Sequence, residues 1–224
     1  MARATHQPIS DKEQWRPESP VVTLSRDYGS GGDEIAGMLS ERLGVPLYDM
    51  VILEEIAKRL EADEAVLRRI DEHISTVRDL WLLNVITGHH VDLSSYRRTL
   101  VNVVLMVARM GGVIVGRGAH VILSTACALR IRVAGSPDVC AKRVMALEGI
   151  SEAAALAKIR NVNSNRGRFV WEMFHVRHND PTQFDITLNT DRMVDMIPCV
   201  EMLMTMARAI YAGDVVQNNA RVPM

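Results

Sequence analysis

A short stretch near the N-terminus carries the residues best suited to binding phosphate. In residues 21–39, VVTLSRDYGSGGDEIAGML, an apolar segment leads into a glycine-rich turn that opens a helical pattern. Gly29, Gly31 and Gly32 allow backbone conformations and close approaches that a β-carbon forbids. The amides of such a turn, at the positive end of a helix, form an anion site. An ordinary tight turn between a strand and a helix would have the same composition.

The turn departs from the usual phosphate-binding loop, GxxxxGK[ST]. That pattern would place glycine at Arg26, lysine at Gly32, and serine or threonine at Asp33. The chain therefore lacks the loop lysine that ordinarily stabilises a transferred phosphoryl group. Asp33 has two interpretations, as the N-cap of the following helix or as a Mg²⁺ ligand, and the cap is favoured.

Arginine is the other residue type that suits phosphate, because its planar guanidinium group matches the phosphate oxygens. Arg117 stands between two glycines, where it is hard to explain as part of a core. The arginines that could converge to replace the missing lysine are Arg26, Arg117, Arg143, Arg166 and Arg168. The arginines after residue 159 have a second interpretation, as a solvated helix face.

The elements that would position these residues alternate between strands and helices. Strands are predicted at residues 21–24, 45–48, 113–115, 129–133 and 184–188. Helices are predicted at residues 34–43, 52–60, 65–74, 77–86, 96–110, 138–147, 152–160 and 196–211. The alternation implies a parallel sheet covered by helices on both faces, which is an α/β fold.

Composition and charge restrict the classes of protein. The 224 residues are 48% hydrophobic and 24% charged, which suits one large domain or a domain with an inserted lid. A net charge of −1 provides no field that favours nucleic acid or an anionic membrane. No apolar run is long enough to span a bilayer, and we recognise no secretory leader, so we expect a cytoplasmic protein.

The sequence contains few residues that suggest a metal site or a protein partner. The pairs His89-His90 and His175-x-x-His178 lack a third ligand at suitable spacing, so we expect surface or interface histidines and no metal site built by the protein alone. The polar arm at the N-terminus contains Trp15, which could anchor it to a partner. Together with the helical middle of the chain, this arm favours a homodimer.

Four segments, in this order, resemble the cytidylate kinase-like family: SRDYGSGGDEIA, VPLYD, VIVGRGAHVIL with LRIRVAGSPDVCAKRV, and FDITLNTDR. The resemblance implies a three-layer P-loop NTPase kinase-type fold, with a five-stranded parallel sheet flanked by helices. It divides the chain into an N-terminal arm (1–20), a single kinase-like domain (21–212) and a C-terminal tail (213–224). Within the domain it implies a helical NMP-binding or insert region at about 49–110 and a lid at about 160–178.

The resemblance also implies roles for individual residues. The donor phosphates of ATP, with Mg²⁺, would bind at the loop, through Arg26, Gly29, Ser30, Gly31, Gly32, Asp33 and Glu34. The acceptor nucleotide would contact Asp49, Arg117 and Arg160, although Asp49 could simply cap the following helix. Catalysis would depend on Arg117, Arg166 and Arg168, with the lid arginines folded over the transferring phosphoryl group. The chain departs from the family at its GRD motif, which reads GRG, and at Asn161 and Asn163, where acids are expected.

The implied function is ATP-dependent phosphoryl transfer to a nucleoside monophosphate, with CMP or dCMP as the first acceptor to test. A kinase of the same fold that uses another small acceptor is one alternative. A nucleotide-binding or regulatory protein that has lost catalysis is the other. The missing lysine, Asp33 and the asparagines of the lid favour this last alternative.

Overall fold

The computed structural model describes residues 16–53 and 93–213. These residues form a five-stranded sheet with the strand order β2-β3-β1-β4-β5, in which every neighbouring pair is parallel. The strands are β1 (Val21–Arg26), β2 (Leu47–Tyr48), β3 (Gly112–Val115), β4 (Leu129–Ala134) and β5 (Ile186–Asn189). Their carboxyl ends meet at one edge of the sheet, which is where open α/β sheets bind ligands.

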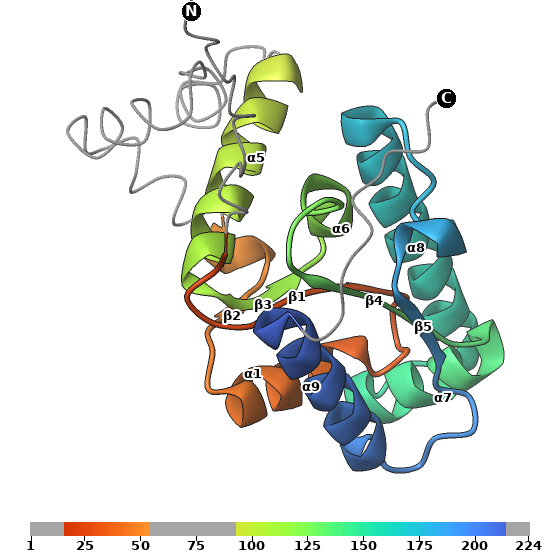
Figure 1. The fold of residues 1–224 in the computed structure, drawn as a ribbon. Coiled ribbons are helices and arrows are strands. Elements are labelled where there is room, and N and C mark those ends of the chain that lie inside the picture. The colour runs from red at the N-terminus through yellow and green to blue at the C-terminus, as the bar shows by residue number, and fades with distance from the viewer. Residues whose placement is uncertain (1–15, 54–92, 214–224) are drawn as a thin grey trace, which may run out of the picture.

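Helices cover both faces of the sheet, so that the domain has three layers (Figure 1). They are α1 (Gly32–Leu43), α5 (Leu93–Met110), α6 (Ala119–Ile122), α7 (Pro137–Glu148), α8 (Glu152–Phe174) and α9 (Ile197–Ala212). A short 3₁₀ helix, η1, spans Pro181–Gln183. Within the described residues, no helix has the length and apolar character that crossing a membrane requires.

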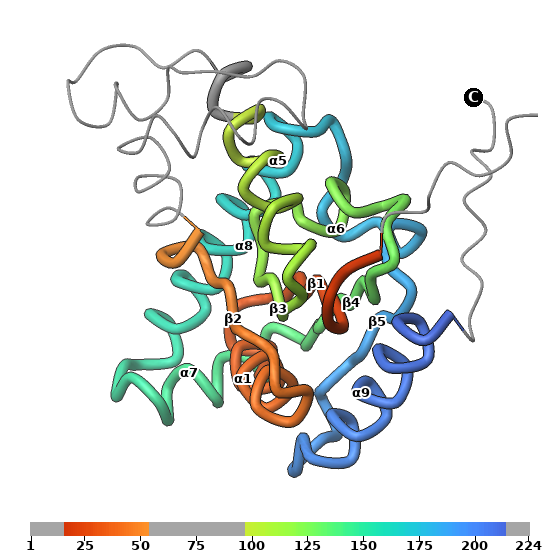
Figure 2. Tube along the Cα trace, turned by 60° about the vertical axis from the view of Figure 1, so that its left-hand side comes forward, coloured from red at the N-terminus to blue at the C-terminus, as the bar shows by residue number. Residues whose placement is uncertain are grey.

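Helices α1 and α9 lie side by side on one face of the sheet (Figures 1 and 2). Val22 and Leu24 of β1 point toward this face, two residues apart, as strand geometry requires. They pack with Ile35 and Leu39 of α1 and with Leu203 of α9. The spacing of four in α1 places its apolar residues on one side, so this helix is fixed against the strand that precedes the glycine-rich loop.

Helices α5 and α6 cover the opposite face of the sheet. Val104 and Val107 of α5 pack with Ile114 of β3 and Leu123 after α6. Met173, near the C-terminal end of α8, belongs to the same cluster. Helix α8 therefore reaches across the edge of the sheet and closes over its carboxyl end.

The N-terminal part of α8 packs in a different cluster. Ala155 and Ile159 of α8 contact Cys140 and Val144 of α7, well away from the cluster around α5. The two ends of α8 are thus buried in two separate apolar clusters, and the middle of the helix lies between them (Figure 1). This arrangement places residues 160–168 beside the glycine-rich loop.

The structure confirms the α/β prediction and all five strands, with two differences in the elements around them. The helix predicted over residues 152–160 continues to Phe174, so most of the segment interpreted as a lid is part of one long helix. The last strand begins at Ile186, because residues 181–183 form η1 first. The helices predicted at 65–74 and 77–86, most of the helix at 52–60, Trp15 and most of the C-terminal tail lie outside the described residues.

Candidate functional site

The glycine-rich loop joins β1 to α1 at the carboxyl edge of the sheet. Gly29 and Gly31 have φ values of 81° and 79°, in the left-handed region that favours glycine, and Gly31 is the N-cap of α1. The amides in the first turn of an α-helix have no partner within the helix and lie at its positive end. The loop therefore has the geometry of an anion cradle, and a phosphate group would fit its chemistry.

Asp33 does not cap α1, so the cap interpretation is wrong. Gly31 is at the N-cap position, and no side chain accepts a hydrogen bond there. Asp33 lies in the first turn of the helix, where its Oδ1 accepts a hydrogen bond from Arg26 Nε at 2.9 Å. Its side chain is 66% exposed. An ion pair with Arg26 therefore holds this carboxylate beside the anion cradle.

Arg26 packs directly on the loop and reaches the next loop along the sheet. A β-carbon at Gly32 would lie 2.5 Å from Arg26 Cβ, so any side chain at position 32 would collide with Arg26. Arg26 Nη1 lies 3.0 Å from the place where a β-carbon of Gly116 would stand. The guanidinium group of Arg26 thus lies between the glycine-rich loop and the loop that follows β3. The lysine of the usual pattern would therefore clash with Arg26 at position 32.

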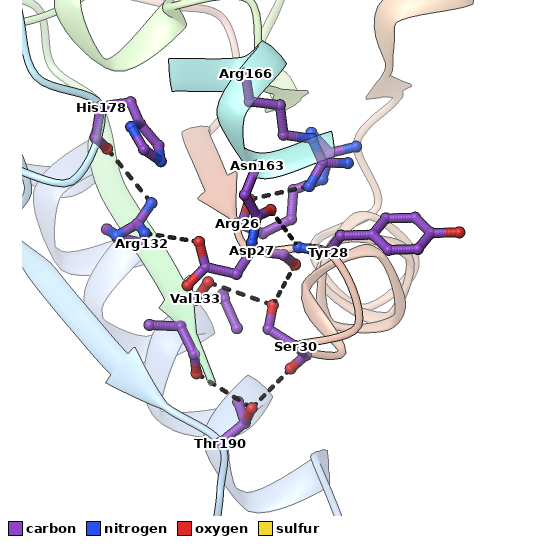
Figure 3. Close-up of polar contacts among 11 residues, drawn as sticks. Arg26, Asp27, Tyr28, Ser30, Arg132, Val133, Asn163, Arg166, His178 and Thr190 are labelled. Carbon is purple, nitrogen blue, oxygen red and sulfur yellow. Dashed lines mark hydrogen bonds and ion pairs between the residues drawn. The ribbon is translucent and has the colours of Figure 1, made fainter. Parts of the chain in front are cut away.

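Ser30 and Arg143 make hydrogen bonds that hold the glycine-rich loop in place. Ser30 is fully buried, and its hydroxyl donates to Asp27 O at 2.8 Å. Thr190 Oγ1 in turn donates to Ser30 O at 2.7 Å (Figure 3). The guanidinium group of Arg143 donates to Thr190 Oγ1 at 2.9 Å and to the carbonyls of Thr190 and Met193. Arg143 therefore supports the residues that hold the loop and lies outside the pocket lining, and its contact with phosphate stays a prediction.

Helix α8 contacts the loop from above, through residues one turn apart. Asn163 Oδ1 accepts a hydrogen bond from Tyr28 N at 2.8 Å, and Arg166 Nη1 donates to Arg26 O at 3.0 Å (Figure 3). The hydroxyl of Tyr28 also donates to Glu148 Oε1, at the end of α7. Asn163 contributes a neutral acceptor where the family resemblance implies an acid.

A pocket of about 390 Å³ lies beneath α8, at the carboxyl ends of β1 and β3. Its lining consists of Ser25, Arg26, Met50, Val115, Gly116, Arg117, Gly118, His120, Val162, Asn165, Arg166, Phe169, Val170 and His178. This lining includes three arginines and two histidines but no carboxylate among the described residues. It favours an anionic ligand that also has an apolar or flat portion.

Three of the predicted arginines, Arg26, Arg117 and Arg166, meet at this pocket. Arg117 adopts φ 52°, which is uncommon for a residue with a side chain, and its guanidinium group lies 4.8 Å from the centre of the Phe169 ring. Burial, and then the neighbouring charge of Arg26, lower the pKa of Arg166 to about 10. Arg166 therefore remains charged at neutral pH, next to a second cation.

Asp49 lies outside the pocket lining and caps the helical turn that follows it. Its Oδ1 accepts a hydrogen bond from Ile52 N at 2.9 Å, and its carbonyl accepts from Leu53 N at 3.0 Å. The adjacent residue, Met50, does line the pocket. In this structure the capping interpretation accounts for the contacts of Asp49, and the pocket is one residue away.

The two remaining lid arginines lie away from the pocket lining. Arg168 is 69% exposed, and its guanidinium group donates to Asn165 Oδ1 at 3.4 Å and lies 3.9 Å from Glu172 Oε1. Arg160 is also exposed on α8, as is Glu34 in the first turn of α1. Because α8 is a continuous helix, Arg166 faces the pocket while Arg160 and Arg168 face solvent.

Two histidines at the pocket were missed by sequence reasoning. His178, expected at a surface or an interface, is half-buried in the pocket lining, and burial lowers the pKa of its imidazole. His120, on α6, is 3% exposed and stacks on Phe184 with a ring-centroid distance of 4.6 Å. Burial, with smaller effects of nearby cations, lowers the pKa of His120 to about 4. The sequence signal that could have identified His120 is its position three residues after Arg117, on the turn that follows the GRG loop.

The side chains at the loop could hold Mg²⁺ only together with the phosphate oxygens of a bound nucleotide. Among the described residues, no group of three or more His, Cys, Asp or Glu side chains could hold a metal ion by itself. Mg²⁺ in phosphoryl-transfer sites commonly uses one or two carboxylates, and phosphate oxygens and water complete its coordination. Asp33, at the loop, is a carboxylate that could take this part.

The chain was compared with curated proteins and with solved structures. A search of curated proteins found no significant match. Among solved structures, the chain is similar to an uncharacterized protein from Eubacterium ventriosum ATCC 27560, with 24% identity, a TM-score of 0.64, and coverage of 85% of this chain and 99% of that one. It is also similar to a shikimate kinase from Bacteroides thetaiotaomicron, with 16% identity, a TM-score of 0.46, and coverage of 86% and 98%. A gluconokinase from Sinorhizobium meliloti 1021 has 14% identity, a TM-score of 0.45, and coverage of 88% and 97%.

The sequence model of the cytidylate kinase-like family matches residues 21–192, which is most of the chain. This range contains the glycine-rich loop, the pocket and all five strands. The three-layer architecture and its strand order are those of a P-loop kinase-type fold. The chain therefore belongs to the cytidylate kinase-like family.

Proposed function

We propose that this protein transfers a phosphoryl group from ATP to a nucleoside monophosphate, with CMP or dCMP as the acceptor. The donor phosphates would lie on the glycine-rich loop, and the acceptor would lie in the pocket beneath α8. Its phosphate would face Arg26, Arg117 and Arg166, and its base would lie among the apolar residues of the lining. The volume of about 390 Å³ is within the usual range for small-molecule sites.

This proposal rests on one observation: the guanidinium groups of Arg26 and Arg166 lie close together between the loop and the pocket. Arg166 is bonded to the backbone of Arg26, and the charge of Arg26 contributes to the lowered pKa of Arg166. Two guanidinium groups held side by side repel each other, and an anion placed between them would relieve that repulsion. A phosphoryl group in transit between donor and acceptor carries negative charge on its equatorial oxygens and would occupy such a position.

The proposed roles follow from this placement. The amides of Gly29, Gly31 and Gly32 would bind donor phosphate, and Arg26 would replace the missing loop lysine. Arg117 would hold the acceptor phosphate. ATP supplies the phosphoryl group, and Asp33 would help to hold its Mg²⁺. Arg160, Arg168 and Asp49 would join the site only if nucleotide binding drew the segment 160–178 and residues 49–53 toward the pocket, as a lid and an acceptor-binding region.

A protein that binds nucleotides without turnover is the second candidate, and the ion pair between Arg26 and Asp33 favours it. This pair partly neutralises the cation that would replace the lysine. It also keeps a carboxylate beside the phosphate cradle, where it would repel an anion that carries no metal.

A coupled assay for ADP release tests the proposal. It would use ATP and Mg²⁺ with a panel of acceptors that contains CMP, dCMP, UMP, AMP, GMP and non-nucleotide alcohols such as shikimate and gluconate. Turnover with CMP or dCMP above the other acceptors is expected. Turnover with only a non-nucleotide acceptor, or nucleotide binding by calorimetry with no turnover, would replace the proposal with one of its two alternatives. Arg208→Ala is a suitable control, because Arg208 is exposed on α9 and lies outside the pocket lining.

A further inference from the structure

The pocket has a second polar region that the arginines do not account for. His120 lines the pocket from α6, and its Nε2 is buried and has no hydrogen-bond partner among the described residues. A buried polar atom without a partner destabilises a protein, so native structures rarely keep one without a reason. His120 belongs to the lining of a ligand-sized pocket, so a ligand that enters beside its ring can provide the missing partner.

The ring of His120 is held in place by the fold. It stacks on Phe184, just before β5, with an angle of 26° between the rings. Arg130 and Arg132 lie near enough to lower its pKa, but each of them is already paired, Arg130 with Asp185 at 2.6 Å and Arg132 with Asp27 at 2.8 Å. Both arginines direct these N–H groups at carboxylates, and neither of them hydrogen-bonds Nε2.

We propose that His120 is a specificity-determining residue of this pocket, whose Nε2 hydrogen-bonds the neutral edge of the base of a phosphorylated acceptor. This inference rests on the proposed function, because the phosphate of that acceptor is assigned to the three arginines. The inference adds that the imidazole of His120 recognises the base, at the opposite end of the acceptor from its phosphate.

The chemistry of the lining agrees with a ligand that has two different ends. The cations gather where the loop, the residues after β3 and α8 meet, whereas His120 is neutral at pH 7 because its pKa is about 4. Between them the lining offers apolar side chains such as Val115, Phe169 and Val170, which suit the faces of a flat heterocycle. A neutral imidazole can either donate or accept a hydrogen bond, and both kinds of group are present on the edge of a nucleobase.

The decisive comparison uses His120→Phe and His120→Gln in the full chain. Phenylalanine keeps a ring on Phe184 but removes Nε2, so the KM for CMP should rise about tenfold with little change in the KM for ATP. Glutamine keeps a polar group at a similar reach, and its KM for CMP should stay within about threefold of the original value. His175→Phe is the matched control, since His175 is exposed at the end of α8 and outside the pocket lining.

Ribose 5-phosphate separates recognition of the base from recognition of the sugar. Its dissociation constant, measured by calorimetry, should be the same for the original protein and for His120→Phe, because it lacks a base. Equal weakening of CMP and ribose 5-phosphate would overturn the assignment to the base. An unchanged KM for CMP in His120→Phe would overturn the inference while leaving the proposed function intact.

The inference can fail separately from the proposed function. If no acceptor is turned over, the proposed function fails, and the dissociation constant of CMP then decides the inference. Weaker binding of CMP by His120→Phe supports it, and equal binding, or no binding by the original protein, overturns it. Thermal unfolding checks that each variant is folded, and His120→Leu, with the same expected tenfold effect on CMP, takes the place of a phenylalanine variant that does not fold.

Discussion

Arg26 Nε lies 2.9 Å from Asp33 Oδ1, and this ion pair connects the residue before the glycine-rich loop to the residue after it. The loop lacks the lysine of an ordinary phosphate-binding loop, and the Arg26 side chain fills the space that a side chain at Gly32 would need. A cation is therefore present at the cradle, but it comes from the end of β1 and is paired with a carboxylate. The charge available to a phosphate depends on whether that pair opens.

Asp33→Asn should strengthen binding of metal-free ATP. The Asp33 carboxylate repels phosphate and also neutralises the charge of Arg26, and the substitution removes both effects. We expect the dissociation constant of ATP without Mg²⁺ to fall by about fivefold, as measured by calorimetry. Stability should change by less than about 1 kcal/mol, because the pair is largely exposed on the side of Asp33. Glu41→Gln, on the exposed surface of α1, is the control. Weaker binding of metal-free ATP by the Asp33 variant would contradict this account.

Arg117→Ala should weaken acceptor binding strongly and leave the protein folded. A charge-assisted hydrogen bond to phosphate contributes about 1.5–3 kcal/mol, so the KM for CMP should rise by about ten- to a hundredfold. The backbone of Arg117 already has φ 52°, and alanine is no worse there than arginine, so the melting temperature should change little. Arg208→Ala provides the matched loss of one arginine outside the pocket. Unchanged acceptor affinity and turnover in the Arg117 variant would remove it from the site.

Arg166→Ala and Arg168→Ala should differ, although the two residues are neighbours on α8. Arg166 lies in the pocket lining beside Arg26, so its loss should lower kcat by about a hundredfold or more. Arg168 is exposed and contacts Asn165, so its loss should lower kcat by much less. Steady-state kinetics with saturating ATP and CMP measure both effects, with Lys142→Ala on α7 as the control. Equal losses in the two variants would show that α8 changes its orientation when nucleotides bind.

The stability of the protein should fall in mild acid because of His120. The pKa of His120 is about 4 in the folded protein, against 6.5 for an ordinary histidine, so the unfolded chain binds the proton more readily. Its contribution to stability is complete above pH 6.5 and is lost as the pH falls toward 4. At pH 5 the loss should reach about 2 kcal/mol, and His120→Phe should lack this component. Urea unfolding at pH 7.5 and pH 5 measures it, and identical pH dependence in the two proteins would contradict the prediction.

The sequence was sufficient to predict the sheet and the glycine-rich turn between β1 and α1. A β-branched run that ends in Gly29, Gly31 and Gly32 leads into a helix whose apolar residues are spaced by four, and each of these signals is local. The family resemblance added the kinase-type fold. It also pointed to Arg117 and Arg166, which the fold brings to one pocket together with Arg26.

The length of α8 was not predicted, because its apolar contacts are divided between two clusters. Ala155 and Ile159 contact α7, whereas Met173 contacts the cluster around α5, so no single stripe runs along the helix. The glycine at position 167, within α8, has a tertiary reason, since a β-carbon there would lie 2.8 Å from His178 Nδ1. His120 was missed for a similar reason, because its burial depends on Phe184, which is distant in the sequence.

The anchoring of α8 at both ends makes the number of residues between its anchors as important as their identity. Ile159 and Met173 are buried in separate clusters, on either side of the segment that carries Arg166. One residue inserted between Ile159 and Arg166 would rotate the rest of the helix by about 100°, which is the angle that each residue contributes. Either Arg166 would leave the pocket or one of the two anchors would leave its cluster. Variation in this stretch should therefore occur by substitution and not by insertion or deletion.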